Sequence, residues 1–281
     1  MKVGYLGPKN SFTHQAAKSC FPENQLTSYQ TIAACIHSVY QEEITYGVIP
    51  IENSLEGSVN DSIDRLFHLG DLVVLGEIVL PIKQQLLVAN QTTQIEKILS
   101  HPQALAQSQQ FLYEHYPTVP IEAVSSTTYA AEFVAQHPDL GLAAIASKKA
   151  ATEYGLNILS ADIQDNLFNQ TRFWIISRKN QLLPMALGHL KKATLFITLA
   201  NNQAGSLHKI LECFAKRAID LSKIESRPLK TSLGEYFFVL DLLYDDNEAL
   251  ILEAIEAVET IGGSVNYLGL YPLKTVLEEE L

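Results

Sequence analysis

The sequence is short of cysteine, of long apolar runs and of positive charge, and each shortage excludes a class of protein. Its three cysteines, Cys20, Cys35 and Cys213, lie far apart among apolar residues, so we expect reduced thiols in the core and neither disulfides nor a metal site. No segment reaches the ~18 consecutive apolar residues of a membrane helix, and the first residues do not resemble a signal peptide. We therefore expect a cytoplasmic protein that does not bind membranes.

The charge balance disfavours nucleic acids as partners. The chain has 20 basic and 31 acidic residues, which give a formal net charge of −11, and such a surface repels polyanions. The sequence also contains no GxGxxG or Walker loop, no GxSxG turn and no HExxH pair. Nucleotide-binding, hydrolase and metal functions therefore lack the motifs that they require.

The first part of the chain has the pattern of an α/β domain. Residues 1–178 alternate short apolar strands with amphipathic helices, which predicts mainly parallel sheets. The runs 71–90 and 162–177 could each pass between two sheets, so residues from about 82 to 165 would form an inserted subdomain. We expect a two-lobed domain like that of periplasmic binding proteins, with a ligand cleft between the lobes. Strands are expected at 3–6, 46–51, 72–80, 86–88, 121–124 and 140–146, and helices near 11–20, 31–42, 58–69, 103–115, 127–136 and 147–154.

The pattern changes beyond residue 193. Residues 194–271 predict strand, helix, strand, strand, helix and strand, which is the βαββαβ order of a ferredoxin-like module. Both helices have an apolar face at helical spacing, formed by Leu207, Ile210 and Phe214 in one and by Ile251 and Val258 in the other. We expect a second folding unit here.

A polar pair begins the apolar strand Phe173–Ile176. Thr171 sets an uncharged hydroxyl beside the guanidinium of Arg172, and the following apolar run is typical of a strand buried on both faces. Arginine matches a carboxylate through two hydrogen bonds. The pair therefore suits a small substrate with more than one negative charge, although an ordinary core strand with a solvated Arg at its start would show the same pattern.

Three other segments place polar residues at the ends of expected strands. Glu52 and Asn53 lie in the segment 49–59, where several polar side chains follow a buried strand and favour a site over simple turn chemistry. The segments 7–15 and 100–107 both join a strand to a helix. Ser11 and Ser100 are placed to cap those helices. Capping alone would explain the segment 100–107 and residues 125–128, whereas for 7–15 an anion-binding role is as open as capping.

Taken together, these motifs closely resemble those of the prephenate dehydratase family, and the residues after them resemble its ACT regulatory domain. The resemblance covers nearly the whole chain, with four motifs in the right order. The motifs are Gly7–Gln15, Pro50–Val59, Ser100–Gln103 with Gln107, and Thr171–Phe173, and the ACT signatures are Ala204–Leu207 and Glu225–Pro228.

The resemblance implies a reaction, its residues and its regulation. The chain would convert prephenate to phenylpyruvate, water and carbon dioxide with no cofactor and no metal, under allosteric inhibition by L-phenylalanine. The catalytic residues would be Thr171, Glu52, Asn53 and Gln107. The substrate-binding residues would be Ser11, Thr13, Ser54, Ser100, Arg172 and Phe173, with Arg172 as a carboxylate clamp. The phenylalanine site would comprise Asn201, Ala204, Gly205, Ser206, Leu207, Glu225, Ser226 and Arg227, in a homodimer or homotetramer formed through the ACT domains.

The sequence departs from the family pattern at three positions. Asn10 and Ser108 stand where the family usually has Gly and Cys, and Ala204 stands where a Pro commonly precedes the Gly. The first departure could tighten its loop. The last leaves the strength and the sign of phenylalanine control open.

For the chemistry we expect Thr171 to donate a hydrogen bond to the departing hydroxyl. A threonine is too weak an acid to transfer its proton completely, so Glu52, if burial raises its pKa, or His14 would supply the proton. Two other functions stay open. Arogenate dehydratase acts on a substrate that differs only in an amino group, and an amino-acid-sensing binding protein would use the same two lobes without turnover.

Overall fold

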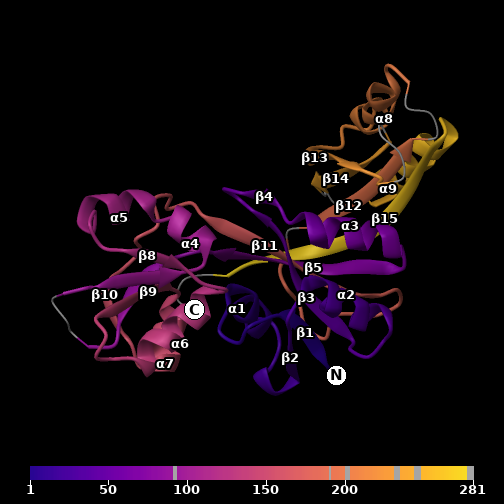
Figure 1. Ribbon diagram of the computed structural model, residues 1–281. Helices are drawn as coiled ribbons and strands as arrows, with labels where there is room; N and C mark the ends of the chain where they lie inside the picture. Colours follow the sequence, from indigo (N-terminus) through magenta and orange to yellow (C-terminus); the bar gives the residue numbers. More distant parts are fainter. Residues whose placement is uncertain (91–93, 190, 200–202, 231–234, 244–247, 277–281) are drawn as a thin grey trace.

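The chain folds into two lobes and a C-terminal module that lies beside the first lobe (Figure 1). The computed structural model describes residues 1–276 except for 91–93, 190, 200–202, 231–234 and 244–247. No helix in these ranges combines the length and the apolar character needed to span a bilayer. The α/β class and the two-lobed arrangement agree with the expectation from the sequence.

The first lobe is a mixed sheet with helices on both faces. Its elements are β1 (Val3–Leu6), α1 (Phe12–Lys18), the 3-10 helix η1 (Glu23–Gln25), β2 (Leu26–Tyr29), α2 (Ile32–Tyr40), β3 (Tyr46–Asn53), β4 (Gly57–Ser58), α3 (Asn60–Leu69), β5 (Leu72–Pro81) and β11 (Gln170–Arg178). The strand order is β5-β11-β3-β1-β2, with β4 paired to β3. β1 is parallel to β2 and β3, whereas β11 is antiparallel to β3 and β5.

β11 lies at the centre of this sheet and is buried on both faces, as its apolar run predicts. Phe173 and Ile175 pack with α1 on one face, and Trp174 and Ile176 pack with α2 and α3 on the other. Successive side chains of a strand point to opposite faces. The same alternation places Thr171 and Arg172, near the start of the strand, on opposite faces of the sheet.

The inserted lobe has its own sheet. Its elements are β6 (Gln85–Val88), β7 (Lys97–Ser100), α4 (Pro102–Ala106), α5 (Gln109–His115), β8 (Ile121–Ala123), α6 (Thr127–Gln136), β9 (Leu142–Ala146), α7 (Lys148–Tyr154) and β10 (Asn157–Ser160), with strand order β10-β6-β9-β7-β8. The helix expected at 103–115 is two helices, because the chain leaves helical geometry at Ser108, where φ is −122°. β2 and β10 were not predicted, since both are edge strands with mostly exposed side chains and no apolar run.

The C-terminal module has the expected βαββαβ order. Its elements are β12 (Lys191–Leu199), α8 (Ser206–Ala215), β13 (Leu221–Pro228), β14 (Tyr236–Leu243), α9 (Glu248–Thr260) and β15 (Gly263–Thr275), with strand order β13-β14-β12-β15. α8 and α9 pack on one face of this sheet. The other face packs on the first lobe, where Phe196, Phe237 and Tyr271 join the core that contains Trp174.

β15 joins the module to the first lobe through the backbone. It pairs antiparallel with β12 from Gly263 to Pro272, and its last residues, Leu273–Thr275, pair in parallel with Glu77–Val79 of β5. The strands of the module and of the first lobe thus form a continuous ten-stranded sheet. The sheet of the module is therefore joined by backbone hydrogen bonds to β5, which lies beside β11.

The apolar contact between module and first lobe should contribute strongly to stability. Phe237 is fully buried and stacks on Phe67, with ring centroids 3.9 Å apart. Phe237→Ala should therefore destabilise the protein by ~3–5 kcal/mol, measured as a lower midpoint of thermal unfolding. The matched control is Phe168→Ala, because Phe168 is 84% exposed. Equal midpoints for the two variants would show that this contact does not hold the module in place.

Candidate active site

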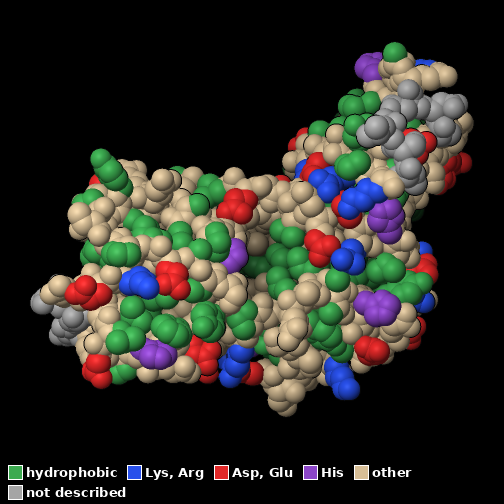
Figure 2. All heavy atoms as spheres, viewed as in Figure 1, with side chains coloured by type: hydrophobic (Ala, Val, Ile, Leu, Met, Phe, Trp, Pro, Cys, Tyr) green, Lys and Arg blue, Asp and Glu red, His purple; other side chains and the backbone are tan. Residues whose placement is uncertain are grey.

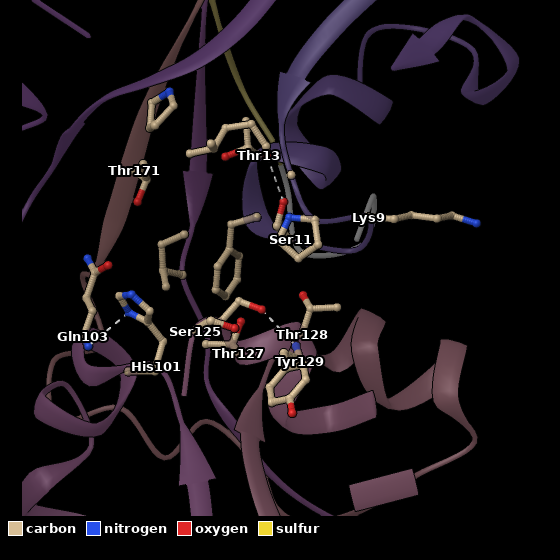
Figure 3. A pocket seen from close by; sticks show the side chains of 18 of the residues that line it. Lys9, Ser11, Thr13, His101, Gln103, Ser125, Thr127, Thr128, Tyr129 and Thr171 are labelled. Carbon is tan, nitrogen blue, oxygen red and sulfur yellow. Dashed lines mark hydrogen bonds between the residues drawn. The ribbon is translucent and has the colours of Figure 1, made fainter. Parts of the chain in front are cut away.

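A cleft of about 1070 Å³ lies between the first lobe and the inserted lobe. Figure 2 shows it as a hollow between the two lobes. Figure 3 shows Ser11, Thr13 and Thr171 of the first lobe across from residues of the inserted lobe. The lining residues from the inserted lobe include His101, Gln103, Ala104, Gln107, Ser125, Ser126, Thr127, Thr128, Tyr129, Glu132 and Tyr154.

Thr171 faces this cleft and is oriented by Asn53. The two residues are directly opposite each other on β11 and β3, and Asn53 Nδ2 donates to Thr171 Oγ1 over 3.0 Å. The Asn53 amide is itself fixed, because its Oδ1 accepts from the backbone N–H groups of Leu55 and Glu56. Since the Thr171 oxygen accepts this bond, its own hydrogen points elsewhere. Across the described residues, no protein acceptor takes that hydrogen, so it is available to a ligand.

A chain of amides extends from this pair into the inserted lobe. Asn53 Nδ2 also donates to Asn169 Oδ1 over 2.8 Å, and Asn169 Nδ2 donates to Gln107 Oε1 over 3.0 Å. Gln107 Nε2 then donates to Glu56 Oε1 over 3.3 Å. Asn169 was not predicted as a site residue, although it stands two residues before Thr171. The network connects the two lobes, so it fixes Thr171 relative to both.

Three helices begin at the cleft. Ser11 caps α1, Ser126 caps α6, and His101 caps α4 by accepting the N–H of Gln103 at its Nδ1 over 3.2 Å. The first N–H groups of a helix have no acceptor within the helix, so they attract anions. In the sequence, helix capping alone explained the polar residues 125–128. In the structure these residues also line the cleft.

Arg172 and Glu52 do not face the cleft, which corrects the expectation from the sequence. Arg172 Nη1 contacts Glu52 Oε2 at 2.5 Å, and its Nη2 contacts Glu77 Oε2 at 2.6 Å and Asp241 Oδ2 at 2.7 Å. The reason is strand geometry, because neighbours on a strand point to opposite faces. A guanidinium surrounded by three carboxylates on the far face cannot clamp a substrate in the cleft.

The charge state of Glu52 also conflicts with the expected role of proton donor. Burial alone would raise the pKa of Glu52, but Lys223 and Arg172 together hold that pKa below its ordinary value. Glu52 Oε1 lies 3.1 Å from Lys223 Nζ of the C-terminal module. Glu52 therefore stays ionised at neutral pH, and its place is the junction between module and first lobe.

Three further candidates have structural partners outside the cleft. Ser54 is exposed and bonds to the backbone of Phe168 and Gln170. Ser100 is fully buried and donates to the carbonyl of Ile145, so the expectation that it caps the helix was wrong and His101 is the cap. His14 is buried and accepts the N–H of Asn10, and burial lowers the pKa of its imidazole. A neutral His14 in this position is no source of protons for the cleft.

Asn10 itself has a conformational role. Its φ is 66°, in the left-handed region that favours Gly and tolerates Asn. The replacement of the family's usual Gly therefore keeps the turn, and it leaves the backbone N–H of Asn10 free to bond His14.

The residues expected to bind phenylalanine divide between the two faces of the module. Ala204, Gly205, Ser206 and Leu207 form the start of α8 on the outer face, and Asn201 lies outside the described residues. Glu225 contacts Ser58 and Lys223 on the inner face. Arg227 also points inward and binds Asp64 at 3.1 Å, whereas Ser226 alternates to the outer face.

Across the described residues, no group of His, Cys, Asp and Glu is arranged to hold a metal.

Comparison with known proteins identifies the family. A family model described as prephenate dehydratase matches residues 3–181. The prephenate dehydratases of Lactococcus lactis (strain IL1403) and Bacillus subtilis (strain 168) are 43% and 44% identical, covering 99% and 96% of this chain and 100% and 98% of theirs. The crystal structure of prephenate dehydratase from Arthrobacter aurescens with L-Phe matches with a TM-score of 0.85 at 30% identity, over 97% of this chain and 90% of that one. The chain therefore belongs to the prephenate dehydratase family.

Proposed function

We propose that this protein is a prephenate dehydratase, a lyase that forms phenylpyruvate. The bond from the ring to its carboxylate breaks and leaves its electron pair in the ring. The bond from the ring to the hydroxyl breaks with its pair on oxygen, and one proton completes the water. The ring becomes aromatic, so the substrate supplies the driving force. The observation that supports this reaction most directly is the Thr171 hydroxyl, which Asn53 orients with its hydrogen available to the cleft.

Thr171 would stabilise the departing oxygen. A donor fixed in advance toward a developing negative charge is typically worth ~10²–10³ in rate. Asn53 fixes this donor, and Asn169 and Gln107 fix Asn53. The four residues therefore act as one preorganised unit, in which Thr171 contacts the substrate and the amides position it.

Helix starts and hydroxyls would bind the two carboxylates. Among the lining residues that the structure describes, Lys9 is the one lysine or arginine, and it is ion-paired to Glu23 and Glu153 at the surface. The start of α6 instead offers backbone N–H groups beside the hydroxyls of Ser125 and Thr127. On the first lobe, Ser11, Thr13 and the ring of Phe173 complete the pocket.

His101 would donate a second hydrogen bond to the departing oxygen, and solvent water would supply the proton that Glu52 and His14 cannot supply. The Nδ1 of His101 accepts the N–H of Gln103, so the hydrogen of the neutral ring is on Nε2. His101 also lines the cleft. It therefore combines a fixed ring with a donor nitrogen that has no part in the helix cap.

The C-terminal module would be an ACT domain through which L-phenylalanine inhibits the enzyme. The Arthrobacter aurescens relative was crystallised with L-Phe, and the βαββαβ module here presents the start of α8 on its outer face. We place the effector at Ala204–Leu207 and near Ser226, between the modules of two subunits in a homodimer or homotetramer. The inward-facing Glu225 and Arg227 contact Ser58 and Asp64 of the first lobe, so they would not contact the effector.

The activity and the role of Thr171 are tested together. The wild-type protein should form phenylpyruvate from prephenate, with arogenate assayed in parallel. Thr171→Ala should lower kcat by ~10² or more with a modest change in KM, whereas Thr171→Ser should keep much of the rate. Turnover of arogenate alone, or of neither compound, would reject the proposed activity. Equal rates in the three enzymes would remove Thr171 from the mechanism.

The role of His101 is tested by His101→Ser, which keeps an oxygen to cap α4 but removes the Nε2 donor. We expect kcat to fall by ~10²–10³, because one donor fixed toward a developing negative charge is worth about that much. The matched control is His115→Ser, since His115 is exposed on α5 of the same lobe. An unchanged kcat in the His101 variant would remove His101 from the mechanism.

The effector site is tested by Gly205→Ala. Gly205 has a φ of 84°, so any side chain strains the loop before α8 even though no atom lies in the way. L-Phe inhibition should weaken ~5-fold or more, with the uninhibited rate unchanged. The control is Gly155→Ala in the inserted lobe, where φ is 65° and the space is equally open. Identical inhibition of the two variants in rate assays and calorimetry would place the effector elsewhere.

A further inference from the structure

A charge cluster occupies the junction between the first lobe and the C-terminal module. The first lobe contributes three carboxylates and one guanidinium, and the module contributes four cations and two carboxylates. These groups are Glu52, Asp64, Glu77 and Arg172 from the lobe, and Lys192, Lys223, Arg227, Lys230, Glu225 and Asp241 from the module. The two surfaces therefore carry opposite net charge.

Within this cluster, the pair of Arg172 and Asp241 reverses the pattern. Here the lobe supplies the cation and the module supplies the anion, over 2.7 Å. Asp241 is almost completely buried, and its other oxygen accepts from Thr194, which also bonds Tyr271. Asp241 is thus rigidly held by the module's own strands, and Arg172 is the group that reaches across to it.

Arg172 and Thr171 are consecutive residues of β11, and their partners Glu52 and Asn53 are consecutive residues of β3. The register sets Arg172 opposite Glu52 and Thr171 opposite Asn53. The ladder is irregular immediately after Arg172, where its register shifts before Phe173. The extra residue is Ile51 of β3, so β11 keeps its alternation, with Thr171 and Phe173 on the cleft face and Arg172 and Trp174 on the far face. One peptide unit of a regular strand therefore separates Thr171 from Arg172.

We propose that Arg172 is a positioning residue that couples the C-terminal module to Thr171 through its buried ion pair with Asp241. A displacement of β14 and β12 moves Asp241, Arg172 follows it, and the backbone of β11 carries the change to the Thr171 hydroxyl. This proposal rests on the proposed function, because it supplies the route by which an effector on the module lowers the rate.

The decisive comparison is between Asp241→Asn and Asp64→Asn. Both changes remove one charge from an ion pair between lobe and module, but Asp64 lies on α3 and holds Arg227 rather than β11. Asp241→Asn should lower kcat on prephenate ~10-fold or more with little change in KM, because a small misplacement of a catalytic group is costly. It should also weaken L-Phe inhibition. Asp64→Asn should leave kcat unchanged.

A second readout does not depend on turnover. Trp174 is the single tryptophan of the chain, and its Nε1 donates to Glu77 Oε2, which also binds Arg172. Its fluorescence therefore reports on the cluster directly. L-Phe should change the emission of the wild-type protein, and Asp241→Asn should abolish that change. If wild-type protein fails to convert prephenate but shows this response, the proposed activity is wrong, and the link from the module to the Arg172 cluster stands without it.

Two results would overturn the proposal. The first is a kcat and an L-Phe response in Asp241→Asn that match those of the wild type. The second is an equal loss of kcat in both asparagine variants, which would reduce the pair to general support of the interface. If Asp241→Asn does not fold, Arg172→Lys replaces it, since lysine keeps the charge but cannot bridge three carboxylates. The same losses are then expected, and wild-type behaviour would reject the coupling.

Discussion

The register of β3 against β11 is the constraint on which the site depends. It places two residue pairs back to back, with Asn53 and Thr171 on the cleft face and Glu52 and Arg172 on the face toward the C-terminal module. A slip of one residue would exchange the faces, so a charged pair would enter the cleft and a hydroxyl would be buried at the module. The apolar residues that follow on β11 prevent this slip because they fill two separate cores.

This arrangement leaves the cleft with little fixed positive charge, which suits its proposed reaction. A dianion held by arginines would be stabilised in the ground state as much as in the transition state, and such uniform binding does not raise kcat. Backbone N–H groups and hydroxyls bind more weakly, and they can be aimed at the position where charge develops. Arg172 therefore contributes more as a neutralised structural group than as a clamp.

Sequence patterns predicted the α/β class, the βαββαβ module and the burial of β11 because these follow from apolar periodicity. The resemblance to the prephenate dehydratase family named Thr171, Asn53 and Gln107, which the structure brings together in one network. The error over Arg172 was avoidable, since a strand that buries Phe173 and Trp174 on opposite faces must also separate Thr171 from Arg172. The partnership with Asp241 was not predictable, because it depends on how the module docks.

Burying the charge cluster costs free energy, and stability alone does not explain why charged residues are found at this interface. Removing Glu77 and Asp241 from water is unfavourable, and burial alone would raise the pKa of Glu77, which Arg172 and Lys192 hold below its ordinary value. Apolar residues of similar volume would often hold such an interface at least as firmly. Apolar packing is not directional, whereas the hydrogen bonds of an ion pair depend on the exact positions of both partners. A cluster at this position therefore makes the geometry beside Thr171 depend on the position of the module, which apolar packing alone would not do.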